Sequence, residues 1–334
     1  MPLTEELPFR PKNRVLRAFS SFAMQDWLVL AYLLVLLTGT LLGAGPHRRV
    51  AITCLVVDTA VFLACMLVAR SEVGKWRVAA DVLYRVGLIG AVIASFLQLD
   101  LIMPTVSERL VDLQLYNLDL AVFGFEPAQS WDRYVTPRTT EWFSFFYYSY
   151  FYILTAYLVP MALFEKRVRI LSELSAGLLF VVCVGHCVYL AVPGLGPHVL
   201  LKGQFDHELS GDFWWPLVRS AVDSVSGATE GGRRTDIFPS LHTACPTFLT
   251  LFTFRNRAHK PYRYVWPVTA FFTVNIILAT MFLRWHYLID VVAGLTLAGI
   301  AFAAMCALVP AEVRARAELG TGPVWRPLFG RARR

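Results

Sequence analysis

Apolar runs long enough to cross a bilayer recur along this chain and constrain its fold more than any other feature. A helix needs about 17–25 mainly apolar residues to span the hydrocarbon core. Eight such runs lie near residues 26–43, 50–69, 82–103, 142–164, 172–193, 237–254, 264–283 and 286–309. Of the 334 residues, 56% are hydrophobic and 16% are charged, whereas a soluble domain carries about 25% charged residues. The sequence therefore predicts an all-α, polytopic integral membrane bundle of about eight transmembrane helices.

The spacing of these runs indicates three regions. Residues 1–77 are expected to form a cytoplasmic segment and two accessory transmembrane helices, residues 78–310 a six-helix core, and residues 311–334 a basic cytoplasmic tail. Two long segments between the runs, 104–141 and 194–236, interrupt the pattern. Within the first, residues 106–125 mix leucines with charges, which is typical of an amphipathic helix lying at the membrane interface.

The distribution of positive charge predicts the orientation in the membrane. With the N-terminus in the cytoplasm, the cytoplasmic segments hold 21 of the 31 Lys and Arg residues. Because cytoplasmic loops are enriched in Lys and Arg, both termini are expected in the cytoplasm. The two long segments and the histidine-bearing junctions described below then lie on the extracytoplasmic side. This topology accounts for the basic residues without a nucleic-acid partner.

The cysteines do not suggest a metal or disulfide framework. All six lie in or beside apolar runs and none forms a C-x-x-C pair, so neither a zinc knuckle nor a disulfide scaffold is supported. Cys183, His186 and Cys187 share a helical face, but small thiols are ordinary filling for buried helices. We therefore expect no metal centre at these residues.

The first of two short strings that indicate chemistry is Phe-Pro-Ser-Leu-His at residues 238–242. Proline is favoured in the first turn of a helix, and the N–H groups that follow it form an anion site. Ser240 adds a hydroxyl donor, and His242 is able to give a proton to a departing oxygen. The alternative is a capped transmembrane helix with an incidental histidine.

The second string, Arg-Trp-His-Tyr-Leu-Ile-Asp, occupies residues 284–290. His286 and Asp290 are four residues apart, so on a helix they share a face and can touch. A carboxylate in that position holds an imidazole in one tautomer and leaves the other nitrogen free to attack. The alternative is an interfacial Arg284 with a histidine beside it, but an aspartate inside an apolar span needs a partner.

The two strings together resemble the second and third signatures of the type-2 phosphatidic acid phosphatase superfamily, over roughly residues 180–300. The form F-P-S-L-H with H-Y-L-I-D-V-V-A-G looks more like the branch that contains inositol phosphorylceramide synthases and related bacterial proteins. The resemblance implies His286 as the nucleophile, Asp290 as its orienting partner and His242 as the acid/base. It also implies that Ser240 and nearby amides bind phosphate and that no cofactor is needed.

The chain departs from this pattern in its positive residues. The third signature would place Ser-Arg where this chain has Ala279-Thr280, and the first signature, K-x6-R-P, is absent in its standard form. Its expected counterpart is Tyr189-x3-Pro193-x3-Pro197-His198. The positive phosphate ligands must then come from elsewhere in the chain. The candidates are Arg284, Lys202, Arg233, Arg234 and a protonated His198. The alternative for each is a solvated charge in a loop.

Three functions follow as hypotheses. The first is a membrane lipid-phosphate phosphatase that passes the phosphoryl group to His286 and then to water. The second is a phospho-head-group transferase of the inositol phosphorylceramide synthase kind, in which a lipid or polyol hydroxyl replaces water. The third is a non-catalytic transporter or scaffold, with Asp58, Asp100 and His186 as conducting groups. The partners expected are a lipid phosphate or phospholipid substrate and the bilayer, and the oligomeric state stays open.

Overall fold

The computed structural model describes residues 21–70, 76–107, 109–226, 236–321, 323–326 and 328. Among these residues, β structure is limited to an isolated parallel bridge between Gly194 and Asp236. The all-α fold class predicted from the sequence is therefore confirmed.

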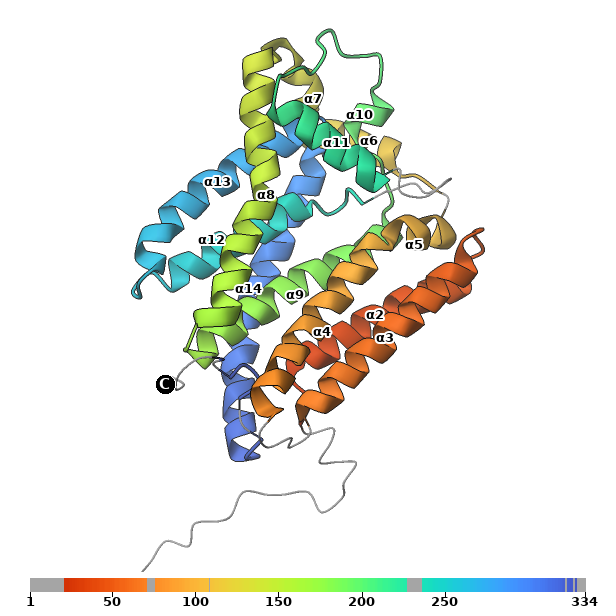
Figure 1. Ribbon diagram of the computed structural model, residues 1–334. Coiled ribbons are helices and arrows are strands. Elements are labelled where there is room, and N and C mark those ends of the chain that lie inside the picture. Colours follow the sequence, from red (N-terminus) through yellow and green to blue (C-terminus); the bar gives the residue numbers. More distant parts are fainter. Residues whose placement is uncertain are drawn as a thin grey trace, which may run out of the picture.

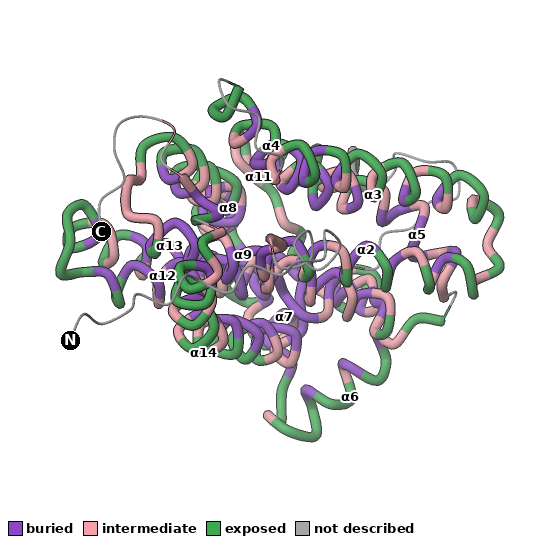
Figure 2. The backbone as a smooth tube through the Cα atoms, turned by 90° about the horizontal axis from the view of Figure 1, so that it is seen from below, coloured by how far each residue is buried: buried purple, intermediate pink, exposed green. Residues whose placement is uncertain are grey.

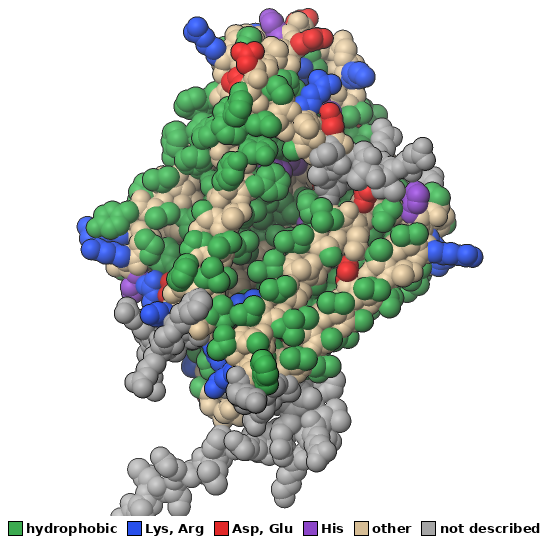
Figure 3. Space-filling view, viewed as in Figure 1, with side chains coloured by type: hydrophobic (Ala, Val, Ile, Leu, Met, Phe, Trp, Pro, Cys, Tyr) green, Lys and Arg blue, Asp and Glu red, His purple; other side chains and the backbone are tan. Residues whose placement is uncertain are grey.

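Seven of the described helices are long and apolar enough to cross a membrane. They are α2 (Met24–Leu42), α3 (Arg48–Arg70), α4 (Arg77–Leu97), α8 (Pro137–Phe164), α9 (Val168–Ala191), α13 (Tyr262–Phe282) and α14 (Leu288–Glu318). Hydrophobic side chains cover most of the face drawn in Figure 3, and Lys and Arg stand mainly at its margins. The protein is a multi-pass membrane protein.

The remaining predicted span, residues 237–254, forms a shorter helix than expected. It corresponds to α12 (Leu241–Arg255), which has 15 residues and is about 22 Å long at 1.5 Å per residue. The hydrocarbon core is about 30 Å thick. The residue before a proline is disfavoured in the helical region, so Phe238 and Pro239 stay outside the helix and α12 begins after Ser240.

The long helices form two groups (Figure 1). α8, α12, α13 and α14 pack together on one side, and α2, α3 and α4 pack together on the other. α9 lies between the groups, against α2 on one side and α12 and α14 on the other. Buried residues face the interior of both groups, and exposed residues face outward (Figure 2). The predicted boundaries of the six-helix core stay a prediction; α4 packs chiefly against α3.

A glycine allows the close contact between α9 and α12. A Cβ added at Gly177 would lie 1.9 Å from the ring of Phe248, so no other residue fits there without displacing the ring. Phe248 is fully buried. Small residues at such positions let membrane helices approach closely, and here the contact holds α12 against the central helix.

Short helices gather at one end of the bundle, which we call the loop end (Figure 1). They are α5 (Leu99–Val106), α6 (Asp112–Phe123), α7 (Pro127–Ser130), η2 (Asp132–Tyr134), α10 (Pro197–Leu200) and α11 (Trp214–Ser226). The start of α2 and the end of α14 meet at the opposite end, where the Met24 N–H donates to Glu312 Oε1 over 2.7 Å. A helix is present within residues 106–125 as α6, but it is shorter than expected and its apolar and polar residues are not separated onto opposite faces.

Candidate active site

The two histidines of the sequence motifs lie close together at the loop end. His242 is in the first turn of α12, and His286 is in the turn between α13 and α14. Their ring centroids are 6.3 Å apart. His286 is only 4% exposed. Two segments that are 44 residues apart in the sequence thus form one site.

Asp290 lies beside the His286 ring. Its Oδ2 is 3.3 Å from His286 Nδ1 and also accepts the Tyr287 N–H over 2.9 Å. We expected a shared helical face, but α14 begins at Leu288, so His286 reaches Asp290 from the turn that precedes the helix. A contact on Nδ1 leaves Nε2 as the nitrogen available for attack.

The Ser240 segment packs directly on α14. The Ser240 N–H donates to the Asp290 carbonyl over 3.1 Å, and a Cβ added at Gly294 would lie 2.5 Å from the Ser240 carbonyl oxygen. Ser240 is fully buried, yet its hydroxyl does not cap α12. The first turn of α12 therefore meets the first turn of α14 at the point where the two histidines face each other.

The ring of His242 lies between two tyrosines of α8. Tyr147 stacks on it at 4.4 Å with an interplanar angle of 12°, and Tyr150 lies 4.2 Å away. These contacts fix the plane of the imidazole, because the ring cannot turn without displacing two buried aromatic residues.

Burial keeps two of the histidines uncharged. Burial lowers the pKa of His286 to about 4, although the Asp236 carboxylate and the Ile237 backbone act in the opposite direction. Burial likewise lowers the pKa of His198 to about 4. At neutral pH the His286 ring is neutral, as a nucleophile requires. Burial therefore disfavours the protonated His198 that was expected as a phosphate ligand.

The Arg284 side chain is already bonded to other groups of the protein rather than directed at the two histidines. Its Nη2 donates to Asp132 Oδ1 and to the His207 carbonyl, each over 2.6 Å, and its guanidinium lies 3.8 Å above the Phe205 ring. Burial opposes the charge of Asp132, but hydrogen bonds from His207 and Asp206 and the charge of Arg284 lower its pKa. Of the Arg284 nitrogens, Nε is the one that is buried without a hydrogen-bond partner.

The other predicted phosphate ligands are scattered. His198 adjoins the site: its N–H donates to the Arg284 carbonyl over 2.9 Å, and its ring is 4.6 Å from that of Trp285. Lys202 is exposed in the turn after α10. Arg233 and Arg234 lie outside the described residues.

Buried polar atoms without a hydrogen-bond partner are frequent in the segments that carry the site. An unpartnered buried polar group is costly, so such a set indicates groups that a ligand would satisfy. In the described part of the chain the set includes His198 Nδ1, Ser240 Oγ, His242 Nε2, Thr243 Oγ1, Arg284 Nε, Trp285 Nε1 and Asp290 Oδ1.

Comparison with known proteins agrees with this geometry. A family model described as the PAP2 superfamily matches residues 113–304, more than half of the chain. The chain belongs to the PAP2 superfamily. Members of this superfamily are phosphatases or phosphotransferases with a helical membrane fold, which supports an enzyme of that type acting on lipids. Searches of curated proteins and of solved structures found no match.

At one position the structure explains how this chain differs from the PAP2 pattern. Thr280 stands where the third signature has arginine, and its hydroxyl donates back to the Ile277 carbonyl over 2.7 Å. Its own carbonyl accepts the N–H groups of Trp285 and His286, at 3.0 and 3.1 Å. Position 280 therefore shapes the turn that carries His286 but supplies no charge to a phosphate.

Sequence reasoning missed the carboxylates that hold the PAP2 site together. Asp112 accepts the N–H groups of Leu195 and Gly196, with the nearest oxygens at 2.9 and 2.7 Å, and Asp132 holds Arg284. Gly196 has φ 95°, and a Cβ added there would lie 2.4 Å from the Trp285 carbonyl oxygen. The available signal was a pair of aspartates two turns apart, Asp112 and Asp119, in a segment otherwise rich in leucine.

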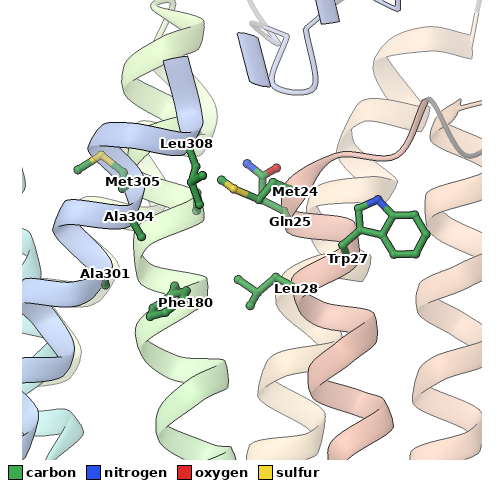
Figure 4. Close-up of a pocket in the computed structure, with 10 residues that line it drawn as sticks. Met24, Gln25, Trp27, Leu28, Phe180, Ala301, Ala304, Met305 and Leu308 are labelled. Carbon is green, nitrogen blue, oxygen red and sulfur yellow. The ribbon is translucent and has the colours of Figure 1, made fainter. Parts of the chain in front are cut away.

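An apolar cavity of about 330 Å³ lies away from this site, between the start of α2, α9 and the second half of α14 (Figure 4). Residues 301–308 of α14 contribute to its lining, and at 1.5 Å per residue they lie roughly 17–27 Å along the helix from Asp290. Its lining consists of Met24, Gln25, Trp27, Leu28, Ala176, Phe180, Ala301, Ala304, Met305 and Leu308. With no ionisable group in its lining, the cavity does not belong to the catalytic site.

The described residues contain no group of three or more His, Cys, Asp and Glu side chains placed to hold a metal ion. His186 is instead bonded through Nδ1 to the Tyr32 hydroxyl, 2.9 Å away. The Tyr32 hydroxyl in turn lies 2.8 Å from Ser95 Oγ. This buried chain of hydrogen bonds joins α2, α4 and α9.

Proposed function

We propose that the protein is a membrane lipid-phosphate phosphatase that works through a phospho-His286 intermediate. The observation that carries the proposal is the arrangement of His286, supported by Asp290, facing His242 at 6.3 Å between ring centroids. Nucleophile, orienting carboxylate and acid/base are the three parts that covalent transfer requires. The unpartnered Ser240 hydroxyl beside them supports a phosphate held between the two rings.

In the first step, the lone pair on His286 Nε2 attacks the phosphorus atom and the bond to the lipid oxygen breaks. His242, which takes up a proton when the anionic phosphate binds beside its ring, gives that proton to the lipid oxygen, so the lipid leaves as an alcohol. Nδ1–H of His286 faces the Asp290 carboxylate, which stabilises the positive charge that the ring acquires.

In the second step, water attacks the phosphorus atom and the bond to Nε2 breaks. His242, now neutral, takes a proton from the water and returns to its starting state. Inorganic phosphate leaves, and the net reaction is hydrolysis of a lipid phosphate to a lipid alcohol. The first amides of α12, which have no side-chain cap, are suited to the phosphate oxygens.

A phospho-head-group transferase, of the kind found in the branch with inositol phosphorylceramide synthases, is the second candidate. Two observations favour it. Thr280 stands in place of the signature arginine and its hydroxyl bonds back to the Ile277 carbonyl of its own helix, and His286 is almost completely buried. A site that excludes water favours an alcohol as the second nucleophile. A lipid or polyol hydroxyl would then take the place of water in the second step.

We further propose that the site faces away from the cytoplasm and that both termini are cytoplasmic. The loop end carries the histidines, whereas α2 begins and α14 ends at the opposite end of the bundle (Figure 1). The concentration of Lys and Arg in the segments at that opposite end supports a cytoplasmic location for it.

A product assay tests the proposal. Purified protein in lipid nanodiscs is incubated with a panel of lipid phosphates and phospho-head-group donors, with and without a chelator. Release of inorganic phosphate that persists in chelator and is lost in His286→Ala is the expected result. A new phosphorylated lipid without free phosphate would favour the transferase, and turnover unchanged in His286→Ala would contradict both.

A further inference from the structure

The helix α6 contacts all three segments that form the site. Leu115 of α6 is buried in an apolar cluster with Ile237 and Tyr287, and Val192, Leu200, Phe238 and Ile289 pack against the same cluster. These residues adjoin His198, Ser240 and His286. A single helix therefore supports segments that come from distant parts of the chain.

Asp119 of α6 supplies the cap of α14. Its two carboxylate oxygens accept the N–H groups of Leu288 at 2.7 Å and Ile289 at 2.8 Å, and Asp119 is fully buried. The first N–H groups of a helix have no partner within the helix, and a Ser, Thr, Asp or Asn at the N-cap normally provides one. Here the N-cap is Tyr287, so the cap comes from another helix.

The cap from Asp119 affects which hydrogen-bond donors the Asp290 carboxylate binds. Asp290 Oδ2 already accepts the Tyr287 N–H at 2.9 Å, and the same oxygen lies 3.3 Å from His286 Nδ1. Without Asp119, the half-buried amides of Leu288 and Ile289 would lose their acceptor, and Asp290 is a carboxylate in the same turn. Competition for this carboxylate would draw it away from His286.

Asp112, two turns earlier on α6, acts on the neighbouring segment. It accepts the N–H groups of Leu195 and Gly196 and the Tyr287 hydroxyl, the last over 3.2 Å. Residues seven apart lie on the same side of a helix. One face of α6 thus holds both the turn before His198 and the turn that carries His286.

We propose that Asp119 is a positioning residue of the active site, which holds the first amides of α14 so that Asp290 stays directed at His286. This inference rests on the proposed function for its kinetic consequence, but the geometry that it explains is independent of the substrate. Asp119 does not touch the reacting atoms and acts through Asp290.

Kinetics of Asp119 variants provide the first test. Asp119→Ala is expected to lower kcat on the order of 10²-fold, because a misplaced catalytic group costs about that much. KM should stay nearly constant, since a loss confined to the transition state lowers kcat and kcat/KM equally. Asp119→Asn, which keeps one acceptor oxygen, should lose less, and Asp119→Glu should recover part of the activity.

Glu141 offers a matched control. Its carboxylate caps α11 in the same way, accepting the N–H groups of Phe213, Trp214 and Trp215 at 3.0, 2.8 and 3.2 Å. Glu141→Gln removes the charge of this cap and keeps one acceptor oxygen, as Asp119→Asn does, without touching the His286 turn. It should lower the melting temperature in detergent but leave kcat unchanged. Equal losses of kcat in Glu141→Gln and Asp119→Asn would show a general structural effect and overturn the proposal.

A readout without substrate separates this inference from the proposed function. In protein with 15N-labelled histidine, the His286 signal is identified by its loss in His286→Ala, and its shifts report the tautomer. The Nδ1–H form is expected in the wild type and in Glu141→Gln, and a mixture of tautomers in Asp119→Asn and Asp119→Ala. An unchanged tautomer in folded Asp119 variants would overturn the positioning role. Absence of lipid-phosphate turnover by the wild type would instead refute the proposed function.

Discussion

Arg284 and Asp132 form an ion pair at 2.6 Å, and each side chain is only 9% exposed. The same guanidinium donates to the His207 carbonyl and covers the Phe205 ring. An arginine two residues before the motif histidine suggests a phosphate ligand, but this one ties the segment 205–207 and η2 to the turn that carries His286.

We therefore expect Arg284→Gln to act mainly on stability. Removing one partner of a buried charged pair costs about 3–5 kcal/mol, so the unfolding free energy should fall by that amount. Asp132→Asn should have a similar effect, and the double variant should lose less than the sum of the two. A large rise in KM with unchanged stability in Arg284→Gln would show instead that the guanidinium binds phosphate.

The pKa of His286 gives a prediction with a definite sign. Burial lowers this pKa to about 4, below the value of about 6.5 for a free histidine. The unfolded chain therefore binds protons first as the pH falls, and stability should decline between about pH 6.5 and 4. A 15N titration of His286 should show a neutral ring at pH 5.5. A titration midpoint near pH 6.5 would contradict the burial of the His286 ring away from water.

The role of His242 predicts a dependence on the leaving group. His242→Ala should slow the hydrolysis of lipid phosphates by roughly 10²–10⁴-fold, the usual contribution of a general acid. An aryl phosphate leaves without protonation, so its first step should be affected much less. Rate losses of equal size for the two kinds of substrate would contradict the assignment of His242 as the acid for the leaving oxygen.

The proposed orientation is tested by labelling from each side of the membrane. In a background without the native cysteines, Lys202→Cys at the loop end and Arg257→Cys between α12 and α13 should react with an impermeant thiol reagent from opposite sides of sealed vesicles. Both positions are exposed. Labelling of both from the same side would refute the topology.

Apolar length predicted most of the membrane helices well, because burial in lipid depends on composition within one segment. The run 50–69 matches α3 closely. The run 142–164 begins five residues too late, because α8 starts at Pro137 with Thr136 and Thr139 capping each other. The run 82–103 is divided at Gln98 between α4 and α5.

The contact between His286 and Asp290 was predictable, but the contacts that support this pair were not. His286 and Asp290 are close in sequence, so their contact depends on one turn of the chain. Asp119 and Asp132 act on partners more than 150 residues away. Such contacts depend on how α6 and η2 pack at the loop end, and no local sequence pattern predicts that packing.

Trapping of the covalent intermediate tests the central claim most directly. Protein is mixed with a lipid phosphate carrying labelled phosphorus, quenched in alkali to preserve phosphohistidine, digested and analysed by mass spectrometry. The account predicts label on His286, none in His286→Ala, and accumulated label in His242→Ala with an aryl phosphate, because loss of the base slows the second step. Label on His242 would reverse the two roles, and full turnover in His286→Ala would contradict the mechanism.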